Sequence, residues 1–150
     1  MKNVFNQTDA NEIIDRINKL TPDTKALWGK MNVAQMSAHC NVTYEMVYEN
    51  KHPKPKGFMK FILKALIKPS VVSEKPYKNN GQTAPAFVIT NERVFENEKK
   101  RLIDFINKTK QLGEANFEGK ESHSFGVLNK TEWNNLFYKH LNHHLSQFGV

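Results

Sequence analysis

The spacing of apolar residues near the C-terminus constrains the fold of this 150-residue chain more than any other feature. They recur every three or four positions, which predicts an amphipathic α-helix with one buried face. His140 and His144 fall on that face, and positions i and i+4 share one side of a helix. A buried imidazole needs a polar partner, and a pair at this spacing is how a helix offers two ligands to one metal ion. The apolar residues of this stripe are Trp133, Leu136, Phe137, Leu141, Leu145 and Phe148.

Three other segments show the same helical spacing, and no segment shows the alternation typical of a strand. The first helix should begin near Thr8 or Asp9 and end before the turn at residues 21–24. A second should run from Asn32 to about Glu49, and a third from Thr90 to Gly113. We therefore expect an all-α four-helix bundle that forms a single domain over residues 1–150.

Two cap patterns and two breaks set the limits of these helices. Asn32 with Gln35, and Asn129 with Glu132, have the form of capping boxes. A short extra helix is expected over residues 58–68, stopped by Pro69. Residues 70–89 and 114–128 then read as irregular connections, the first forming a long crossover.

His39 shows the same behaviour in the second predicted helix. It lies on or beside an apolar stripe that includes Val33, Met36 and Val47. A bundle can bring this helix face to face with the last one, so that His39, His140 and His144 meet. Three neutral imidazoles leave room for water or substrate on a metal, which is typical of a catalytic site.

Composition limits the class of protein. The single cysteine, Cys40, excludes an internal disulfide, and a buried, inert thiol is expected there. The N-terminus has no apolar signal segment, and the longest apolar stretch, residues 58–67, carries two lysines and is too short to cross a bilayer. We therefore expect a cytoplasmic protein.

Three segments together resemble a known superfamily. They are WGKMN at residues 28–32, QMSAHC at 35–40 and YKHLNHHL at 138–145. They resemble the DinB/YfiT-like superfamily, and more narrowly a bacterial branch of unknown function. The resemblance implies a four-helix bundle, often a homodimer, that holds a divalent metal through His39, His140 and His144. Some relatives are thiol-dependent transferases and isomerases whose metal activates a low-molecular-weight thiol.

Other polar residues are weaker candidates. His123, in a loop, is a candidate fourth ligand or acid/base, although such a histidine more often packs or caps locally. Gln35 and Thr43 lie one turn before and after His39, where each would orient it. His143 is expected on a solvated flank or hydrogen-bonded behind the ligands, and His52 is expected to be exposed.

Two functions are compatible with these features. The first is a metal-dependent transferase or hydrolase that activates a thiol or water for attack on a small molecule. Its metal would be zinc, nickel or a similar ion, and its substrate would enter where loops 70–89 and 114–128 cover one end of the bundle. The alternative is a non-catalytic binding module, with structural or no metal, that uses a Lys-rich segment, residues 51–78.

The Lys-rich segment carries the whole net charge of +7, because it holds eight lysines and one acidic residue. No nucleic-acid-binding motif accompanies it. Its predicted helix is basic and amphipathic, which fits binding to a membrane surface. We favour packing of its apolar side on the bundle or on a twin subunit, with the lysines in solvent.

Overall fold

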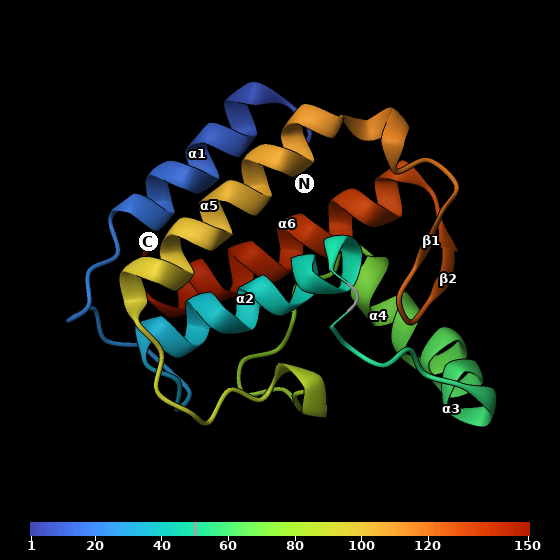
Figure 1. Ribbon diagram of the computed structural model, residues 1–150, viewed down its shortest axis with the longest axis horizontal. Coiled ribbons are helices and arrows are strands. Elements are labelled where there is room, and N and C mark those ends of the chain that lie inside the picture. Colours follow the sequence, from blue (N-terminus) through green and yellow to red (C-terminus); the bar gives the residue numbers. More distant parts are fainter. Residues whose placement is uncertain (50) are drawn as a thin grey trace.

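A computed structural model describes residues 1–49 and 51–150. Four long helices form a bundle: α1 (Gln7–Asn18), α2 (Val33–Tyr48), α5 (Phe95–Leu112) and α6 (Lys130–Gln147). Helix α5 packs against α1 and α2, and α6 packs against the same two helices (Figure 1). The predicted helical bundle is therefore confirmed.

The direction of the helices explains the long crossover. In Figure 1, α1 and α6 run one way along the bundle, while α2 and α5 run the other way. Helices α2 and α5 are therefore parallel neighbours, and the chain must return along the bundle before α5 begins. A long crossover connection between two helices is a known variant of four-helix topology.

Both central capping boxes form as predicted. The backbone N–H of Gln35 donates to Asn32 Oδ1 over 2.8 Å, and the Asn32 N–H donates back to Gln35 Oε1 over 3.1 Å. Asn129 and Glu132 repeat this exchange at the start of α6. Each box satisfies two backbone groups that a helix start leaves without a partner.

The start of α1 lies one residue before the predicted Thr8, and the predicted start of α5 was wrong. Helix α1 begins earlier, because the Asn6 side chain accepts the Asp9 N–H over 2.8 Å and so acts as the cap. Helix α5 begins at Phe95 instead of after Thr90. Arg93 bonds to Asn91 and to Glu98, which ties the residues before the helix to its first turn.

The crossover is more helical than predicted. Helix α3 (Gly57–Ile62) continues into a π-helical turn η1 (Leu63–Ile67) and then into α4 (Lys68–Val72). Pro69 was expected to stop the helix, but it lies in the first turn of α4. Proline lacks the N–H that would continue the helical hydrogen bonds, and the chain stays helical with a π-helical turn directly before α4. A short 3-10 turn, η2 (Pro85–Phe87), follows before α5.

A small hairpin corrects the expectation of no strand. After a 3-10 turn, η3 (Glu114–Asn116), strand β1 (Lys120–Ser122) pairs antiparallel with β2 (Gly126–Leu128). The Ser122 hydroxyl donates to the Gly126 carbonyl and accepts the Phe125 N–H, each over 2.9 Å. Strands of three residues are too short to show an alternation of apolar and polar side chains. The missed signal was Ser122, whose side chain forms the bonds of the turn.

Aromatic rings fill the half of the core that adjoins the start of α6. Phe137 stacks on Tyr44 with ring centroids 5.0 Å apart, and Trp133 and Phe117 pack on its other sides. All four are nearly fully buried. The next turn of α6 carries His140, so the histidines begin where this aromatic cluster ends. Among the described residues, no helix is long and apolar enough to cross a membrane.

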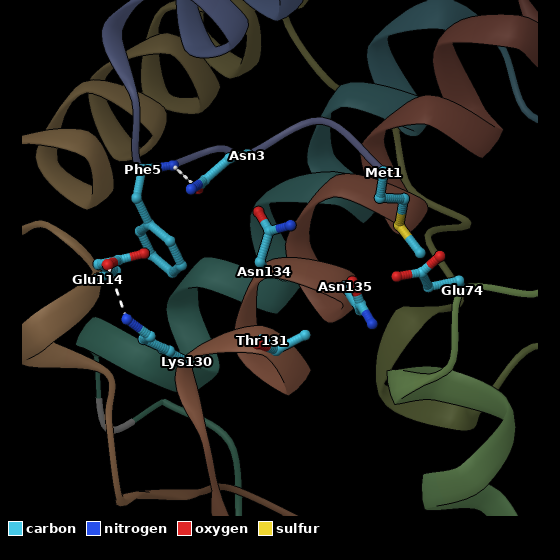
Figure 2. A pocket seen from close by; sticks show the side chains of 9 residues that line it. All are labelled: Met1, Asn3, Phe5, Glu74, Glu114, Lys130, Thr131, Asn134 and Asn135. Atoms are coloured by element: carbon cyan, nitrogen blue, oxygen red, sulfur yellow. Dashed lines mark hydrogen bonds and ion pairs between the residues drawn. The ribbon is translucent and has the colours of Figure 1, made fainter.

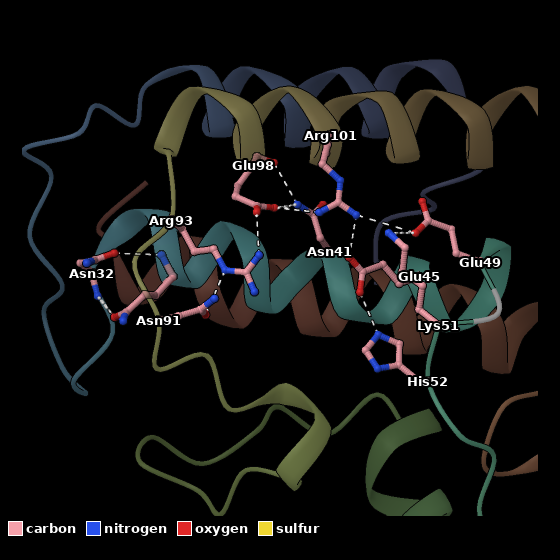
Figure 3. Close-up of polar contacts among 11 residues, drawn as sticks. Asn32, Asn41, Glu45, Glu49, Lys51, His52, Asn91, Arg93, Glu98 and Arg101 are labelled. Atoms are coloured by element: carbon pink, nitrogen blue, oxygen red, sulfur yellow. Dashed lines mark hydrogen bonds and ion pairs between the residues drawn. The ribbon is translucent and has the colours of Figure 1, made fainter.

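A buried polar network joins α2 to α5 (Figure 3). Glu98 accepts hydrogen bonds from Asn41 Nδ2 over 2.8 Å and from Arg101 Nη1 over 3.0 Å. Arg101 also donates to Glu45 over 2.6 Å, and His52 Nε2 lies 2.8 Å from the second oxygen of Glu45. His52 was expected to be exposed, but this bond and partial burial hold it against α2.

Candidate metal centre

Helices α2 and α6 bring three histidines together. Helix α2 contributes His39, and α6 contributes His140 and His144 from adjacent turns. One ring nitrogen of each lies within 4.8 Å of the other two, and the Nε2 atoms of His39 and His140 are 2.9 Å apart. His39 and His144 are buried, and His140 is partly buried. Nowhere else in residues 1–49 and 51–150 do three histidine, cysteine or acidic side chains group in this way.

Each of the three rings is held from behind through its Nδ1 atom. Nδ1 of His39 lies 2.8 Å from the Phe87 carbonyl oxygen, in η2. A carbonyl can only accept, so His39 carries its proton on Nδ1 and leaves a lone pair on Nε2. Nδ1 of His140 lies 3.0 Å from the hydroxyl of Thr43. A carbonyl or hydroxyl behind a histidine is the usual way to fix a metal ligand.

Gln147 holds the third ring and is itself anchored. Its Nε2 donates to the Trp28 carbonyl over 2.7 Å, which leaves Oε1 facing Nδ1 of His144 at 2.8 Å. His144 therefore also carries its proton on Nδ1 and presents a lone pair on Nε2. Gly29 leaves the space for this amide, because a Cβ there would lie 2.5 Å from Gln147 Nε2.

The close approach of His39 to His140 requires a positive charge or a proton between them. Nε2 of His39 carries a lone pair, and a second lone pair 2.9 Å away would repel it. Two arrangements remove the repulsion. Thr43 can donate to Nδ1 of His140, which then carries its proton on Nε2, or Thr43 can accept from Nδ1 while both Nε2 atoms bind a cation. The Thr43 hydroxyl serves both arrangements because it both donates and accepts.

Burial keeps the three imidazoles neutral. Desolvation lowers the pKa of His39, lowers that of His140 well below its ordinary value, and lowers the pKa of His144 to about 3. The contacts of His39 with Phe87 and of His144 with Gln147 oppose this effect in part. Neutral imidazole is the form that binds a metal, so at pH 7 no proton has to leave before one binds.

The donor set fits a divalent metal. In a tetrahedral zinc site with Zn–N distances of about 2.0–2.1 Å, ligand nitrogens lie about 3.3 Å apart. The ring nitrogens of the three histidines lie between 2.9 Å and 4.8 Å apart, and this range includes the zinc-site separation. Imidazole ligands suit zinc, nickel, copper and iron, and three of them leave coordination positions for another group.

Comparison with known proteins adds a family. Residues 2–149 match the model of the family described as "Protein of unknown function (DUF1569)". The chain belongs to the DUF1569 family. Neither curated proteins nor solved structures gave a match to this chain.

Not every predicted residue of this DUF1569 protein lies where the sequence suggested. Gln35 holds the Asn32 N–H in the capping box, and the partner of His39 is instead the Phe87 carbonyl. His123 is bonded through one ring nitrogen to the Ser124 hydroxyl and through the other to the His52 carbonyl. Local packing, the commoner role of such a histidine, therefore describes His123.

His143 lies behind the ligands, on the outer side of α6. Its ring is 6.0 Å from that of Trp28 and 5.6 Å from that of Tyr77, and it meets His144 edge-on at 5.0 Å. It is half-buried, and burial lowers its pKa. These contacts let it support the His144 ring by packing.

Sequence reasoning missed two residues of the site. Gln147 follows His144 by three positions, so the same helical spacing that found the histidines would also have found Gln147. The Phe87 carbonyl belongs to a loop 48 residues after His39, and a backbone group leaves no mark in a sequence. Its recruitment depends on how the crossover folds back over α2.

The Phe87 side chain covers the histidines. Its ring centroid is 5.3 Å from that of His39 and 5.7 Å from that of His140. Loop 70–89 therefore covers the site, as expected. Segment 114–128 forms the hairpin beside the start of α6, towards the opposite end of that helix from His144 (Figure 1). The expectation that this segment covers the same end of the bundle as loop 70–89 was therefore wrong.

Two surface cavities flank the bundle, and the three histidines line neither of them. One, of about 230 Å³, lies between the N-terminal segment and α6 and is lined by Phe5, Glu114 and Lys130, among others (Figure 2). The other, of about 250 Å³, is lined by Tyr77, Lys139 and His143, among others.

Proposed function

We propose that this DUF1569 protein binds one divalent metal ion through Nε2 of His39, His140 and His144. We further propose that it is a metal-dependent transferase or hydrolase that acts on a small molecule. The observation that carries the proposal is the convergence of three neutral imidazoles from α2 and α6. Two of them have their Nδ1 protons fixed by oxygen acceptors, so their Nε2 lone pairs point away from those acceptors.

The chain's own residues prepare the site for this role. Phe87, Thr43 and Gln147 hold the rings by hydrogen bonds of 2.8–3.0 Å, so little side-chain entropy remains to be lost on binding. Burial excludes bulk water and keeps the imidazoles unprotonated. A bound divalent ion would supply Lewis acidity, lowering the pKa of a thiol or water at an open position.

The resemblance to the DinB/YfiT-like superfamily supports a thiol as the activated group. The segments at residues 28–32, 35–40 and 138–145 carry that resemblance, and they include all three histidines. The segment at 28–32 also supplies the Trp28 carbonyl and Gly29, which position Gln147 behind His144. We propose zinc or nickel as the ion and a homodimer as the assembly.

Metal content tests the first step. Untagged protein purified without chelator should hold about one divalent ion per chain by elemental mass spectrometry. His140→Ala/His144→Ala should hold none. His123→Ala is a matched control, because its ring nitrogens bond to Ser124 and His52, and it should keep the ion. Stoichiometric metal in the double variant, or none in the wild type after reconstitution, would overturn the proposal.

A structural metal is a second candidate function. It is favoured by one observation, that the Phe87 ring packs against His39 and His140. Under this alternative, removing the ion would lower the melting temperature, and Phe87→Ala would not create turnover. Under the enzymatic proposal, metal-loaded protein should turn over a substrate in transferase or hydrolase screens, and the rate should respond to Phe87→Ala.

A further inference from the structure

The crossover helix presents its apolar side chains to solvent. Neither α3 nor η1 contains a buried residue. Phe58, Phe61 and Leu66 are 75%, 66% and 71% exposed, and the first two stack with ring centroids 6.5 Å apart. Of the two expected partners of this apolar side, the bundle was wrong, and a twin subunit stays a prediction. Met59 and Ile67 extend the same exposed apolar set.

Two lysines of this helix contact the hairpin at the surface. Lys60 forms an ion pair of 3.3 Å with Glu121 on β1. The side chain of Lys64, one turn later, lies 3.8 Å from where a Cβ would stand at Gly126 on β2. These two lysines touch the hairpin while remaining exposed, and Ile62 and Leu63 are the partly buried residues of α3 and η1. The helix therefore buries little of its apolar surface, whereas an ordinary surface helix turns its whole apolar face inward.

The shape of the molecule places this apolar face at a protruding end. Helix α3 extends away from the four-helix bundle, beyond the hairpin (Figure 1). An apolar surface concentrated on a projection is costly in water and marks a site of interaction. A projecting helix is able to reach a flat surface that the bundle itself would not touch.

Charge decides between the partners that would cover this face. The Lys-rich segment 51–78 has a formal net charge of +7. Within the described part of the chain, Lys54 and Lys56, both exposed just before α3, take part in no ion pair. A second copy docked on the same face would bring two such segments together, and their like charges would repel. An anionic phospholipid surface would attract the lysines and also accept the apolar side chains.

We propose that residues 54–67 form a peripheral binding site for an anionic phospholipid membrane. Phe58, Phe61 and Leu66 enter the boundary between headgroups and acyl chains, while Lys54 and Lys56 contact the lipid phosphates. This proposal does not depend on the metal centre, which lies on other elements of the fold.

Vesicle co-sedimentation with the full-length protein tests the proposal. Binding to vesicles of 70% phosphatidylcholine and 30% phosphatidylglycerol should be at least tenfold stronger than binding to phosphatidylcholine alone. It should be lost in 0.5 M NaCl. Equal binding to both kinds of vesicle, or none to either, would overturn the proposal.

Two sets of variants and their matched controls locate the site. Phe58→Ser/Phe61→Ser/Leu66→Ser and Lys54→Gln/Lys56→Gln should each weaken vesicle binding at least tenfold. The exposed Val94→Ser and Lys25→Gln/Lys30→Gln change similar chemistry elsewhere and should bind like the wild type. Since the replaced side chains are exposed, circular dichroism should show folded protein in every case.

Sedimentation velocity separates the membrane from a second copy of the chain. The proposal expects the oligomeric state to be the same in the wild type and in the triple serine variant. A dimer that dissociates in that variant, together with no vesicle binding, would overturn the proposal and assign the face to contact between subunits.

Discussion

A Cβ atom added at Gly29 would lie 2.5 Å from Nε2 of Gln147, the amide that holds His144 in place. Gly29 has a φ of +83°, a left-handed conformation that side chains rarely adopt. The turn before α2 and the last turn of α6 are therefore fitted to each other through a glycine. This contact links the loop to the geometry of a candidate metal ligand.

We predict that Gly29→Ala weakens metal binding as well as folding. The methyl group would displace Gln147, and the Nδ1 proton of His144 would lose its acceptor. Gly119→Ala is the matched control, because Gly119 has a φ of +69° with no atom within 4 Å of the added Cβ. Both variants should lose about 1–2 kcal/mol of unfolding free energy through backbone strain. Isothermal titration with zinc should show a lower affinity for Gly29→Ala alone.

Thr43→Val should lower metal affinity about 10–100-fold, because it removes the hydroxyl that lies 3.0 Å from Nδ1 of His140. Thr43→Ser keeps the hydroxyl and should restore most of the affinity. Thr109→Val removes another buried hydroxyl, which bonds to Tyr48 and to the Phe105 carbonyl. It should affect stability without changing metal affinity, and equal affinities for all of these proteins would contradict the role of Thr43.

Acid should destabilise the metal-free protein. His39, His140 and His144 have lowered pKa values in the folded state, so the unfolded chain binds more protons below its ordinary histidine pKa of about 6.5. The stability is therefore fully present above pH 6.5 and falls as the pH falls. For His144 the loss continues down to a pH of about 3. Each histidine that stays neutral contributes up to about 1.4 kcal/mol per pH unit in this range.

Urea unfolding at pH 7.5 and pH 5.0 measures this effect. The wild type should lose more unfolding free energy between these two pH values than His140→Ala/His144→Ala does. Equal losses would show that other groups control the acid response. Saturating zinc should make the fall of stability steeper, because protons and the metal compete for the same nitrogens.

The network in Figure 3 should support folding without affecting the metal centre. Glu98→Ala removes the carboxylate that accepts from Asn41 and Arg101, and it should cost about 1–3 kcal/mol of unfolding free energy. Lys100→Ala breaks the exposed pair with Asp104 and should change stability little. Thermal denaturation of both variants checks the difference, and zinc affinity should stay at the wild-type value in each.

Local patterns predicted much of the bundle. The capping boxes at Asn32 and Asn129 formed as expected, because every atom in them lies within four residues of its partner. The start of α1 was placed late because Asn6, and not Thr8 or Asp9, is the cap. The start of α5 was misplaced because the helix follows Val94, whose side chain forms no cap bond, and not the more suitable Thr90. The hairpin at residues 120–128 was missed because three-residue strands are too short to show a periodic signal.

The orientation of the crossover helix could not be predicted either. Its sequence indicates an amphipathic helix, and the ordinary expectation buries the apolar side. The structure leaves most of that side exposed, while Lys60 meets Glu121 and Lys64 lies beside Gly126 on the hairpin. Both contacts join residues about 60 positions apart in the chain, so no local pattern carries them.

The sequence by itself determined four amphipathic helices and a pair of imidazoles on one face of the last, because those features depend on spacings of three or four residues. It also indicated His39 as a third member. Tertiary structure alone decided how closely His39 approaches His140 and which backbone carbonyl fixes its proton. The physical reason is that these contacts join segments 48 to 101 residues apart, whose meeting depends on the packing of the whole bundle.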